Sequence, residues 1–378
     1  MDYVKLKDVC TINMGQSPSS DSYNENGHGV PFFQGNADFG ERYPVTRKWC
    51  SAPTKMAAPE DILISVRAPI GAMNYAKEEC CIGRGLAALT PNRAKVSPEY
   101  IFWLLKGKNE ELNSKGTGST FKAIGRNILE ETLVPDISLE KQTECSIILE
   151  KVYRVILSRK QQLQKLDELV KARFVEMFGD PEKNTLSWKE EELSEHLTVI
   201  GGYAFKSEQF SEEGIPVLRI GNINSGFFKP VNLVYWEEDN TLNRYKMYPG
   251  DLVMSLTGTV GKDDYGNVCI LGNDYDVYYL NQRNAKLELQ DTINKYYLSM
   301  LLKFEPVKKK LTGISRGVRQ ANISNKDILN LMVPIPPIEL QNQFAAFVEQ
   351  IDKSKVAIQK ALDEAQLLFD SLMQKYFG

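Results

Sequence analysis

The amino-acid sequence contains an internal repeat, and its spacing constrains the fold more than any other feature. The matching pairs, each 199 positions apart, are Val134 and Val333, Pro135 and Pro334, Glu140 and Glu339, Gln142 and Gln341, and Phe178 and Phe377. Upstream, Pro31 and Asp61 correspond to Pro216 and Asp251, at offsets of 185 and 190. The chain therefore consists of two lobes with a shared scaffold and loops of different length, each followed by a segment of constant length.

Both constant-length segments carry apolar residues at the alternating spacing of three and four that is typical of a helix with one apolar seam. The seam residues are Leu149, Val152, Ile156, Leu163, Leu166 and Val170 in the first segment, and Val348, Ile351, Ile358, Leu362 and Phe369 in the second. A helix of about 40 residues is about 60 Å long. Because such a long seam usually packs on a partner helix, we predict an antiparallel coiled coil. Packing of each helix in a separate core is the alternative.

The lobes mix short apolar runs with helical segments. Runs such as 62–66 and 251–255 are bounded by glycine and proline and predict strands, whereas 98–105 and 295–302 predict helices. The predicted fold class is α+β, a mixed α/β fold with two globular domains in tandem pseudo-repeat. The predicted parts are lobe 1 (residues 1–138), a central helix (139–179), lobe 2 (180–337) and a C-terminal helix (338–378).

Composition and charge argue against a strongly basic nucleic-acid-binding protein and against a membrane protein. The 378 residues include 46 basic and 49 acidic side chains, a net charge of −3. Lobe 1 holds 16 basic and 16 acidic side chains, a net of 0, and lobe 2 holds 18 and 21, a net of −3. Without a global basic field, any contact with DNA is local and needs a more basic partner. No apolar stretch approaches the ~20 residues of a membrane span, and we expect a cytoplasmic protein.

Motifs for catalysis and metal binding are missing from the sequence. The six cysteines and two histidines show no metal-ligand spacing, so we expect no metal site. The phosphate loop GxxxxGK[ST], the amino-methyltransferase tetrapeptide and the carboxylate-x-Lys pair of many nucleases are also absent. We therefore expect a chain without catalytic residues.

Polar loops recur at equivalent places in both lobes and combine side chains that read base edges with side chains that bind phosphates. The candidate DNA-binding residues of lobe 1 are Gln34, Asn36, Arg42, Arg47, Lys48, Arg67, Thr117, Ser119 and Lys122. Those of lobe 2 are Arg219, Asn222, Asn224, Thr257, Thr259, Arg283, Arg316, Arg319, Gln320 and Asn322. Each residue alone fits a solvated loop, and the recurrence favours a nucleic-acid surface.

These features resemble a known family, the specificity (S) subunit of type I restriction-modification systems. The resemblance rests on the repeated helix starts at 134–142 and 333–341, on the Phe-Gly pairs at 178–179 and 377–378, and on segments 15–18, 64–71, 250–261 and 319–324. It implies two target-recognition domains, each reading one half of a split double-stranded DNA site, and a helical pair that sets the spacer and docks two methylation subunits. It also implies a chain without catalysis, whose partners bind S-adenosylmethionine, ATP and Mg, and which restriction subunits join in the nuclease complex.

Two other functions fit the same residues. The first is a coiled-coil scaffold whose lobes bind peptides, and the second is an RNA-binding adaptor. Both would use the helical pair without reading duplex DNA.

Overall fold

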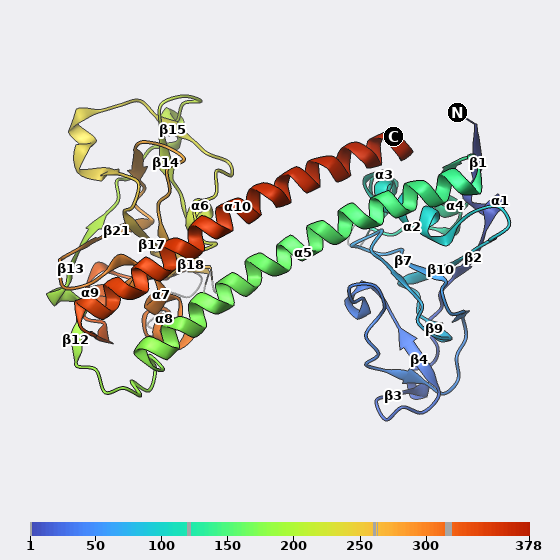
Figure 1. The fold of residues 1–378 in the computed structure, drawn as a ribbon, viewed down its shortest axis with the longest axis horizontal. Coiled ribbons are helices and arrows are strands. Elements are labelled where there is room, and N and C mark those ends of the chain that lie inside the picture. Colours follow the sequence, from blue (N-terminus) through green and yellow to red (C-terminus); the bar gives the residue numbers. More distant parts are fainter. Residues whose placement is uncertain (1, 119–121, 260–261, 263, 314–319) are drawn as a thin grey trace. The chain divides into compact units, whose positions relative to one another are not determined.

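The computed structural model describes residues 2–118, 122–259, 262, 264–313 and 320–378 (Figure 1). The chain forms two compact units: unit 1 contains residues 1–161 and 359–378, and unit 2 contains residues 162–358. Two helices of 40 residues, α5 (Leu139–Phe178) and α10 (Ile338–Phe377), each contribute one half to each unit. Their bounds agree with the predicted segments, and the α+β fold with two repeated domains is confirmed.

The described residues of lobe 1 form short strands and four short α-helices. The strands are β1 (Tyr3–Lys5), β2 (Cys10–Met14), β3 (Tyr23–Asn24), β4 (Val30–Phe33), β5 (Trp49–Cys50), β6 (Met56–Ala57), β7 (Ile62–Ser65), β8 (Met73–Tyr75), β9 (Cys80–Ile82), β10 (Leu86–Pro91) and β11 (Leu133–Pro135). The helices are α1 (Leu6–Val9), α2 (Pro98–Gly107), α3 (Asn109–Ser114) and α4 (Arg126–Glu130). Helix α2 begins where the Ser97 side chain accepts a hydrogen bond from Tyr100 N, with Pro98 in its first turn.

Lobe 2 repeats this pattern. Its strands are β12 (Glu190–Glu192), β13 (Leu197–Gly201), β14 (Ile215–Leu218), β15 (Tyr235–Trp236), β16 (Lys246–Met247), β17 (Leu252–Ser255), β18 (Thr257–Thr259), β19 (Val268–Ile270), β20 (Tyr278–Leu280), β21 (Asn284–Leu289), β22 (Gln320–Asn322) and β23 (Met332–Pro334). Its helices are α6 (Ile220–Ile223), α7 (Lys295–Lys303), α8 (Glu305–Thr312) and α9 (Asn325–Leu329).

The sheets of the two lobes share most of their topology, although the second sheet of lobe 1 has one strand more, β3, than that of lobe 2. The antiparallel sheet β2-β10-β7-β8 of lobe 1 matches β13-β21-β17-β19 of lobe 2. A second sheet has the order β3-β5-β4-β9-β6 in lobe 1 and β15-β14-β20-β16 in lobe 2, and each contains one parallel pair, β4 with β9 and β14 with β20. The ladders β1-β11 and β12-β23 join the start of each lobe to its last strand.

The long helices pack against each other and against a lobe helix in each unit. In unit 1, Trp103 of α2 contacts Tyr153 of α5 and Phe369 of α10, with ring centroids 5.3 and 5.7 Å apart. In unit 2, Phe174 of α5 contacts Phe344 of α10 at 5.4 Å. The early part of α5 therefore meets the late part of α10 in unit 1, and the reverse holds in unit 2, so the helices are antiparallel. No helix in the described part of the chain has the length and apolarity to cross a membrane.

All eleven predicted seam residues are buried or half-buried. Leu149, Ile156, Val170, Val348, Leu362 and Phe369 are buried, and the other five are half-buried. In unit 2, Lys355 Nζ of α10 lies 2.6 Å from Asp167 Oδ1 of α5, which adds an ion pair between the two helices.

The glutamine that recurs at the start of each long helix has the same structural role in both lobes. Gln341 is fully buried, its Oε1 accepts a hydrogen bond from Asn294 N, and its Nε2 donates one to Pro336 O, both at 2.8 Å. Gln142 makes the equivalent bonds from Ser97 N (2.9 Å) and to Ile137 O (2.9 Å). Each glutamine thereby fastens a long helix to the start of a helix of its own lobe, α2 or α7.

Gln341→Leu is expected to lower the free energy of unfolding by about 1–3 kcal/mol, because it leaves the Asn294 N–H and the Pro336 carbonyl without buried partners. The measurement is urea denaturation followed by circular dichroism. Gln343→Leu is the matched control, since Gln343 is exposed on the same helix. Equal effects of the two substitutions would contradict the structural role of Gln341.

Candidate nucleic-acid interface

In each lobe, the two strands of the parallel pair end at the same edge of the sheet. In lobe 2, Arg219 follows β14 and Asn281 follows β20, and the register of the pair places them side by side. In lobe 1, Gln34 follows β4 and Gly83 follows β9 in the same way. We call each of these places, with the turn that follows the second strand, the strand-end junction of its lobe. Because both strands point the same way, the side chains that follow them gather at one place.

The two junctions have the same backbone hydrogen bonds. In lobe 2 the bonds are Leu256 N to Arg283 O (2.8 Å), Tyr203 N to Leu280 O (2.8 Å) and Gly202 N to Asn284 O (3.2 Å). In lobe 1 the equivalents are Val66 N to Gly85 O (2.9 Å), Gln16 N to Ile82 O (3.0 Å) and Gly15 N to Leu86 O (2.9 Å). In each lobe these bonds bring three chain segments together, and they place Arg67 and Thr257 beside the two turns.

Two adjoining cavities open at the lobe 2 junction. Their volumes are about 390 and 220 Å³, and Ile220 and Arg283 line both. Six of the predicted residues line them, namely Arg219, Asn222, Asn224, Thr257, Thr259 and Arg283. Asn322 lies beside them, because its Oδ1 accepts a hydrogen bond from Thr257 Oγ1 at 2.6 Å. The structure thus brings together residues that are far apart in the sequence.

Asn222 is buried at the lobe 2 junction. Its side chain is 1% exposed, its Nδ2 donates to Lys229 O and Val231 O at 2.9 Å each, and its Oδ1 accepts from Arg219 N at 3.0 Å. All of these bonds lie within the protein, and they fasten α6, which begins after Arg219, to the segment that follows it. The DNA contact of Asn222 stays a prediction.

Three further side chains at the lobe 2 junction bond to other residues of the protein. Asn224 Nδ2 donates to Asp264 O (2.7 Å), Thr259 Oγ1 donates to Asp264 Oδ2 (2.9 Å), and Thr257 is bonded to Asn322. These internal hydrogen bonds hold the side chains that line the cavities in place. Among the described residues that line the two cavities, the basic side chains are Arg219, which also donates to Asn232 O, and the exposed Arg283.

At the lobe 1 junction, Gln34 and Arg67 are exposed. Arg67 and Thr117 both form β-bridges with Ala123, and Lys122 O accepts a hydrogen bond from Ala68 N at 3.0 Å. Thr117 and Lys122 are exposed as well and lie next to this region. Four of the predicted lobe 1 residues are therefore close to one another.

Other candidates in lobe 1 have partners elsewhere. Arg42 Nη1 lies 3.4 Å from Glu150 Oε1 of α5 and its guanidinium lies over the Tyr75 ring, so Arg42 ties its loop to the helix. Arg47 Nη1 donates to Ala37 O at 3.4 Å. Asn36 lies two residues beyond Gln34 and is half-buried, and Lys48 is exposed beside β5. Ser119, Arg316 and Arg319 and the side chain of Gln320 lie outside the described residues.

Sequence analysis missed one residue of the lobe 1 junction, Arg84. It lies between β9 and β10, where lobe 2 has Gln282 between β20 and β21. The two positions are 198 residues apart, the same offset as the strands on either side of them. That offset could have revealed Arg84, but the flanking residues Gly83 and Gly85 do not resemble Asn281 and Arg283.

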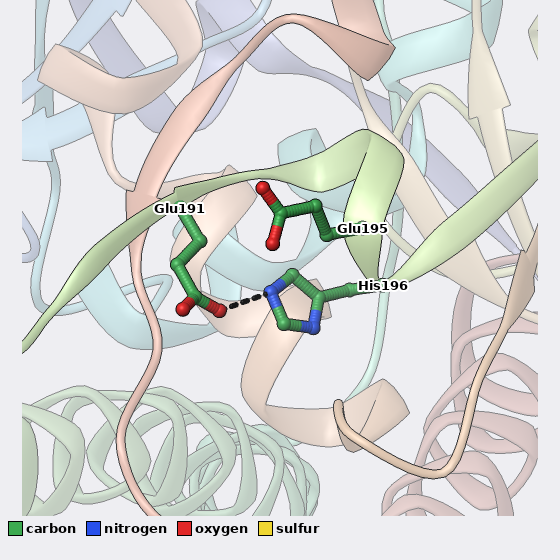
Figure 2. Close-up of side chains that lie close together, drawn as sticks. All are labelled: Glu191, Glu195 and His196. Atoms are coloured by element: carbon green, nitrogen blue, oxygen red, sulfur yellow. Dashed lines mark hydrogen bonds and ion pairs between the residues drawn. The ribbon is translucent and has the colours of Figure 1, made fainter.

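One cluster in the described part of the chain could hold a metal ion, formed by Glu191, Glu195 and His196 (Figure 2). His196 is buried, and its Nε2 lies 2.8 Å from Glu191 Oε2 while its Nδ1 lies 2.8 Å from Thr292 Oγ1. Glu191 is also paired with Lys189, which lowers the pKa of the glutamate. Because both ring nitrogens already have partners, the arrangement is a hydrogen-bonded network that connects β12 to the rest of lobe 2.

The six cysteines are free and buried. Burial raises the pKa of Cys10, Cys80 and Cys269 to about 12. These thiols stay protonated at neutral pH and are poor nucleophiles and metal ligands.

The two strand-end junctions on repeated α+β lobes, with paired long helices, define a two-lobed protein with the same arrangement of strand ends in each lobe. A family model described as "Type I restriction modification DNA specificity domain" matches residues 1–168 and 186–366. The chain therefore belongs to this family.

Several known proteins are similar to the chain. The putative type I restriction enzyme MjaX specificity subunit of Methanocaldococcus jannaschii is 40% identical over 160 residues, which cover 42% of this chain and only 38% of that protein. The MjaIX specificity subunit of the same organism is 23% identical over 99% of this chain and 92% of its own length. The EcoBI specificity subunit of Escherichia coli is 19% identical over 98% and 83%. The crystal structure of the type I S subunit from M. genitalium covers 100% of this chain and 96% of its own, with a TM-score of 0.61 at 15% identity, and so has the same fold.

Proposed function

We propose that the chain is the sequence-specific DNA-binding subunit of a type I restriction-modification complex, in which each lobe reads one half of a bipartite site. The observation that carries this proposal is the strand-end junction, which occurs in both lobes with the same hydrogen bonds and different exposed side chains. A shared scaffold with different side chains suits two surfaces that read different sequences. Family membership supports duplex DNA as the ligand.

The chemistry of the junctions fits the edges of base pairs in the major groove. Arginine donates two parallel hydrogen bonds to O6 and N7 of guanine, and glutamine pairs with N6 and N7 of adenine. Lobe 2 presents Arg219, Gln282 and Arg283, and lobe 1 presents Gln34 and Arg67. Thr117 and Lys122 are suited to positioning on phosphates rather than to base readout.

The helical pair is proposed to set the spacer between the half-sites and to dock two methylation subunits. Exposed apolar side chains on the helices support docking. They are Leu139, Ile147, Val155, Leu367 and Leu368 in unit 1 and Leu169, Val175 and Val356 in unit 2. Such side chains are buried when a partner binds.

In this proposal the chain catalyses no reaction. Its methylation subunits bind S-adenosylmethionine, and restriction subunits with ATP and Mg join the nuclease complex. The assembly acts in the cytoplasm. Because the lobes carry net charges of 0 and −3, most of the phosphate contacts must come from the methylation subunits.

We expect weak binding of duplex DNA by the isolated chain, with a Kd above about 10⁻⁶ M at physiological salt, the range of non-specific contacts. The complex with two methylation subunits is expected to bind its site with a Kd of about 10⁻⁸ M or tighter. The measurement is a gel shift with a duplex that carries the motif methylated in cells expressing the complex.

The control is a duplex of the same composition with the motif scrambled. Tight, site-specific binding by the isolated chain would contradict the need for a basic partner. Preference of the complex for a single-stranded RNA of the same sequence would favour the RNA-binding adaptor. If the complex bound neither nucleic acid, the scaffold function would be favoured.

A further inference from the structure

Arg84 occupies a turn that is held tightly against Gln34. A Cβ atom at Gly85 would collide with the Gln34 carbonyl oxygen, and one at Gly83 would lie 3.2 Å from Gln34 Cα. Arg84 N donates a hydrogen bond to Ser17 Oγ at 3.3 Å, which holds the turn from its other side. The two glycines therefore allow a close approach that places Arg84 beside Gln34, with both side chains exposed.

The guanidinium of Arg84 differs from those of most other lobe 1 arginines. Arg42, Arg93 and Arg126 form ion pairs with Glu150, Glu60 and Glu130. In the part of the chain that the structure describes, neither Arg84 nor Arg67 forms an ion pair with a carboxylate. Asp38, the acidic residue nearest to Gln34 in the sequence, binds the Gln34 backbone N–H at 2.8 Å. The exposed donors of Arg84 are therefore available to a ligand.

The two lobes carry the same two residue types at exchanged positions. Lobe 1 has glutamine after β4 (Gln34) and arginine in the turn (Arg84), whereas lobe 2 has arginine after β14 (Arg219) and glutamine in the turn (Gln282). Both junctions thus present one arginine and one glutamine from neighbouring backbone positions. This pair of groups can read one guanine and one adenine.

We propose that Arg84 is a specificity-determining residue of lobe 1, which reads a guanine through its O6 and N7 acceptors. This inference rests on the proposed function of the lobe as a reader of one half-site. It assigns to the half-site of lobe 1 a guanine whose recognition depends on Arg84.

The test uses the full chain in complex with its methylation subunits. Cells that express the complex are sequenced for methylated motifs with the wild type, with Arg84→Ala and Arg84→Met, and with Arg93→Ala. Arg93 is the matched control, an exposed arginine of the same lobe near the opposite end of β10. Arg84→Met keeps an unbranched side chain without the donors, and thermal unfolding midpoints verify that each variant folds.

Binding of duplexes with single substitutions then measures the penalty at each base pair. For the wild type, replacing the guanine, or substituting 7-deazaguanine for it, is expected to weaken binding by at least about fivefold. For both Arg84 variants, duplexes with and without the guanine are expected to bind about equally well. The penalties for substitutions in the other half-site are expected to stay unchanged. The methylated motif should become degenerate at that one position, and Arg93→Ala should leave it unchanged.

Three results would overturn the assignment. They are a lobe 1 half-site without guanine, a motif that Arg84→Ala leaves unchanged, and a loss of affinity that is uniform over all duplexes, which marks a phosphate contact. Failure of the proposed function has a different signature, because the wild-type complex would then methylate no bipartite site at all.

Discussion

Replacing Phe174 with alanine is expected to lower the free energy of unfolding by about 3–5 kcal/mol, the cost of removing a large aromatic side chain from a packed core. Phe174 is fully buried in unit 2. Its ring contacts those of Phe178 (4.9 Å), Phe304 (5.1 Å), Tyr297 (5.4 Å) and Phe344 (5.4 Å). The substitution removes the side chain that joins α5 to both α7 and α10. Urea denaturation followed by circular dichroism and tryptophan fluorescence measures the loss.

Val175→Ala is the matched control, because Val175 is the next residue of the same helix and is 40% exposed. Its effect is expected to stay within about 0.5 kcal/mol. Hydrogen exchange should show that Phe174→Ala opens unit 2 first. A small effect of Phe174→Ala, similar to that of Val175→Ala, would contradict the assignment of this aromatic cluster as the core that holds the helices in unit 2.

Exchanging one lobe is expected to change one half of the methylated motif completely and to leave the other half unaltered. A chimera with lobe 1 of another family member joined at Pro135 tests this expectation, and the reciprocal chimera replaces lobe 2 up to Pro334. The joints are suitable because both lobes end in the same way: Tyr100 and Tyr297 donate hydrogen bonds to the carbonyl oxygens of Pro135 and Pro334. The measurement is long-read sequencing of methylation in cells that express each complex.

The control for both chimeras is the unmodified parent chain, whose helical segments both chimeras keep. If both half-sites changed in either chimera, the lobes would not read DNA independently. If methylation were lost, copurification of the methylation subunits would show whether the complex had failed to assemble. The proposal is supported only by an assembled complex that methylates a motif with one new half-site and one half-site of the parent chain.

The helices could be predicted closely from the sequence. The constant offset and the three-four spacing led to segments 139–179 and 338–378, and the structure has helices at Leu139–Phe178 and Ile338–Phe377. Helical periodicity depends on contacts between residues three or four positions apart, so it is legible in a short window. The strands were less accessible, because many have only two or three residues and gain their stability from distant partners.

The candidate site shows what the sequence could predict and what required the tertiary structure. Sequence alone could indicate that the polar loops recur in both lobes, and seven of the lobe 2 candidates lie at one junction. It could not separate Asn222, which is buried and bonded within the protein, from Arg219, because both are polar residues only three positions apart in the sequence. Burial depends on which distant chain segments pack over a residue. The sequence around a surface loop does not indicate which segments these are.

The amino-acid sequence by itself determined the repeat, the lengths of the two long helices, the net charge of −3 and the family. Tertiary structure alone decided which side chains meet. Arg84 lies beside Gln34 because β4 and β9 are parallel and the glycines on both sides of Arg84 leave room for the backbone of β4. That proximity joins residues 50 positions apart in the sequence, and it depends on strand pairing, a long-range interaction that no local pattern specifies.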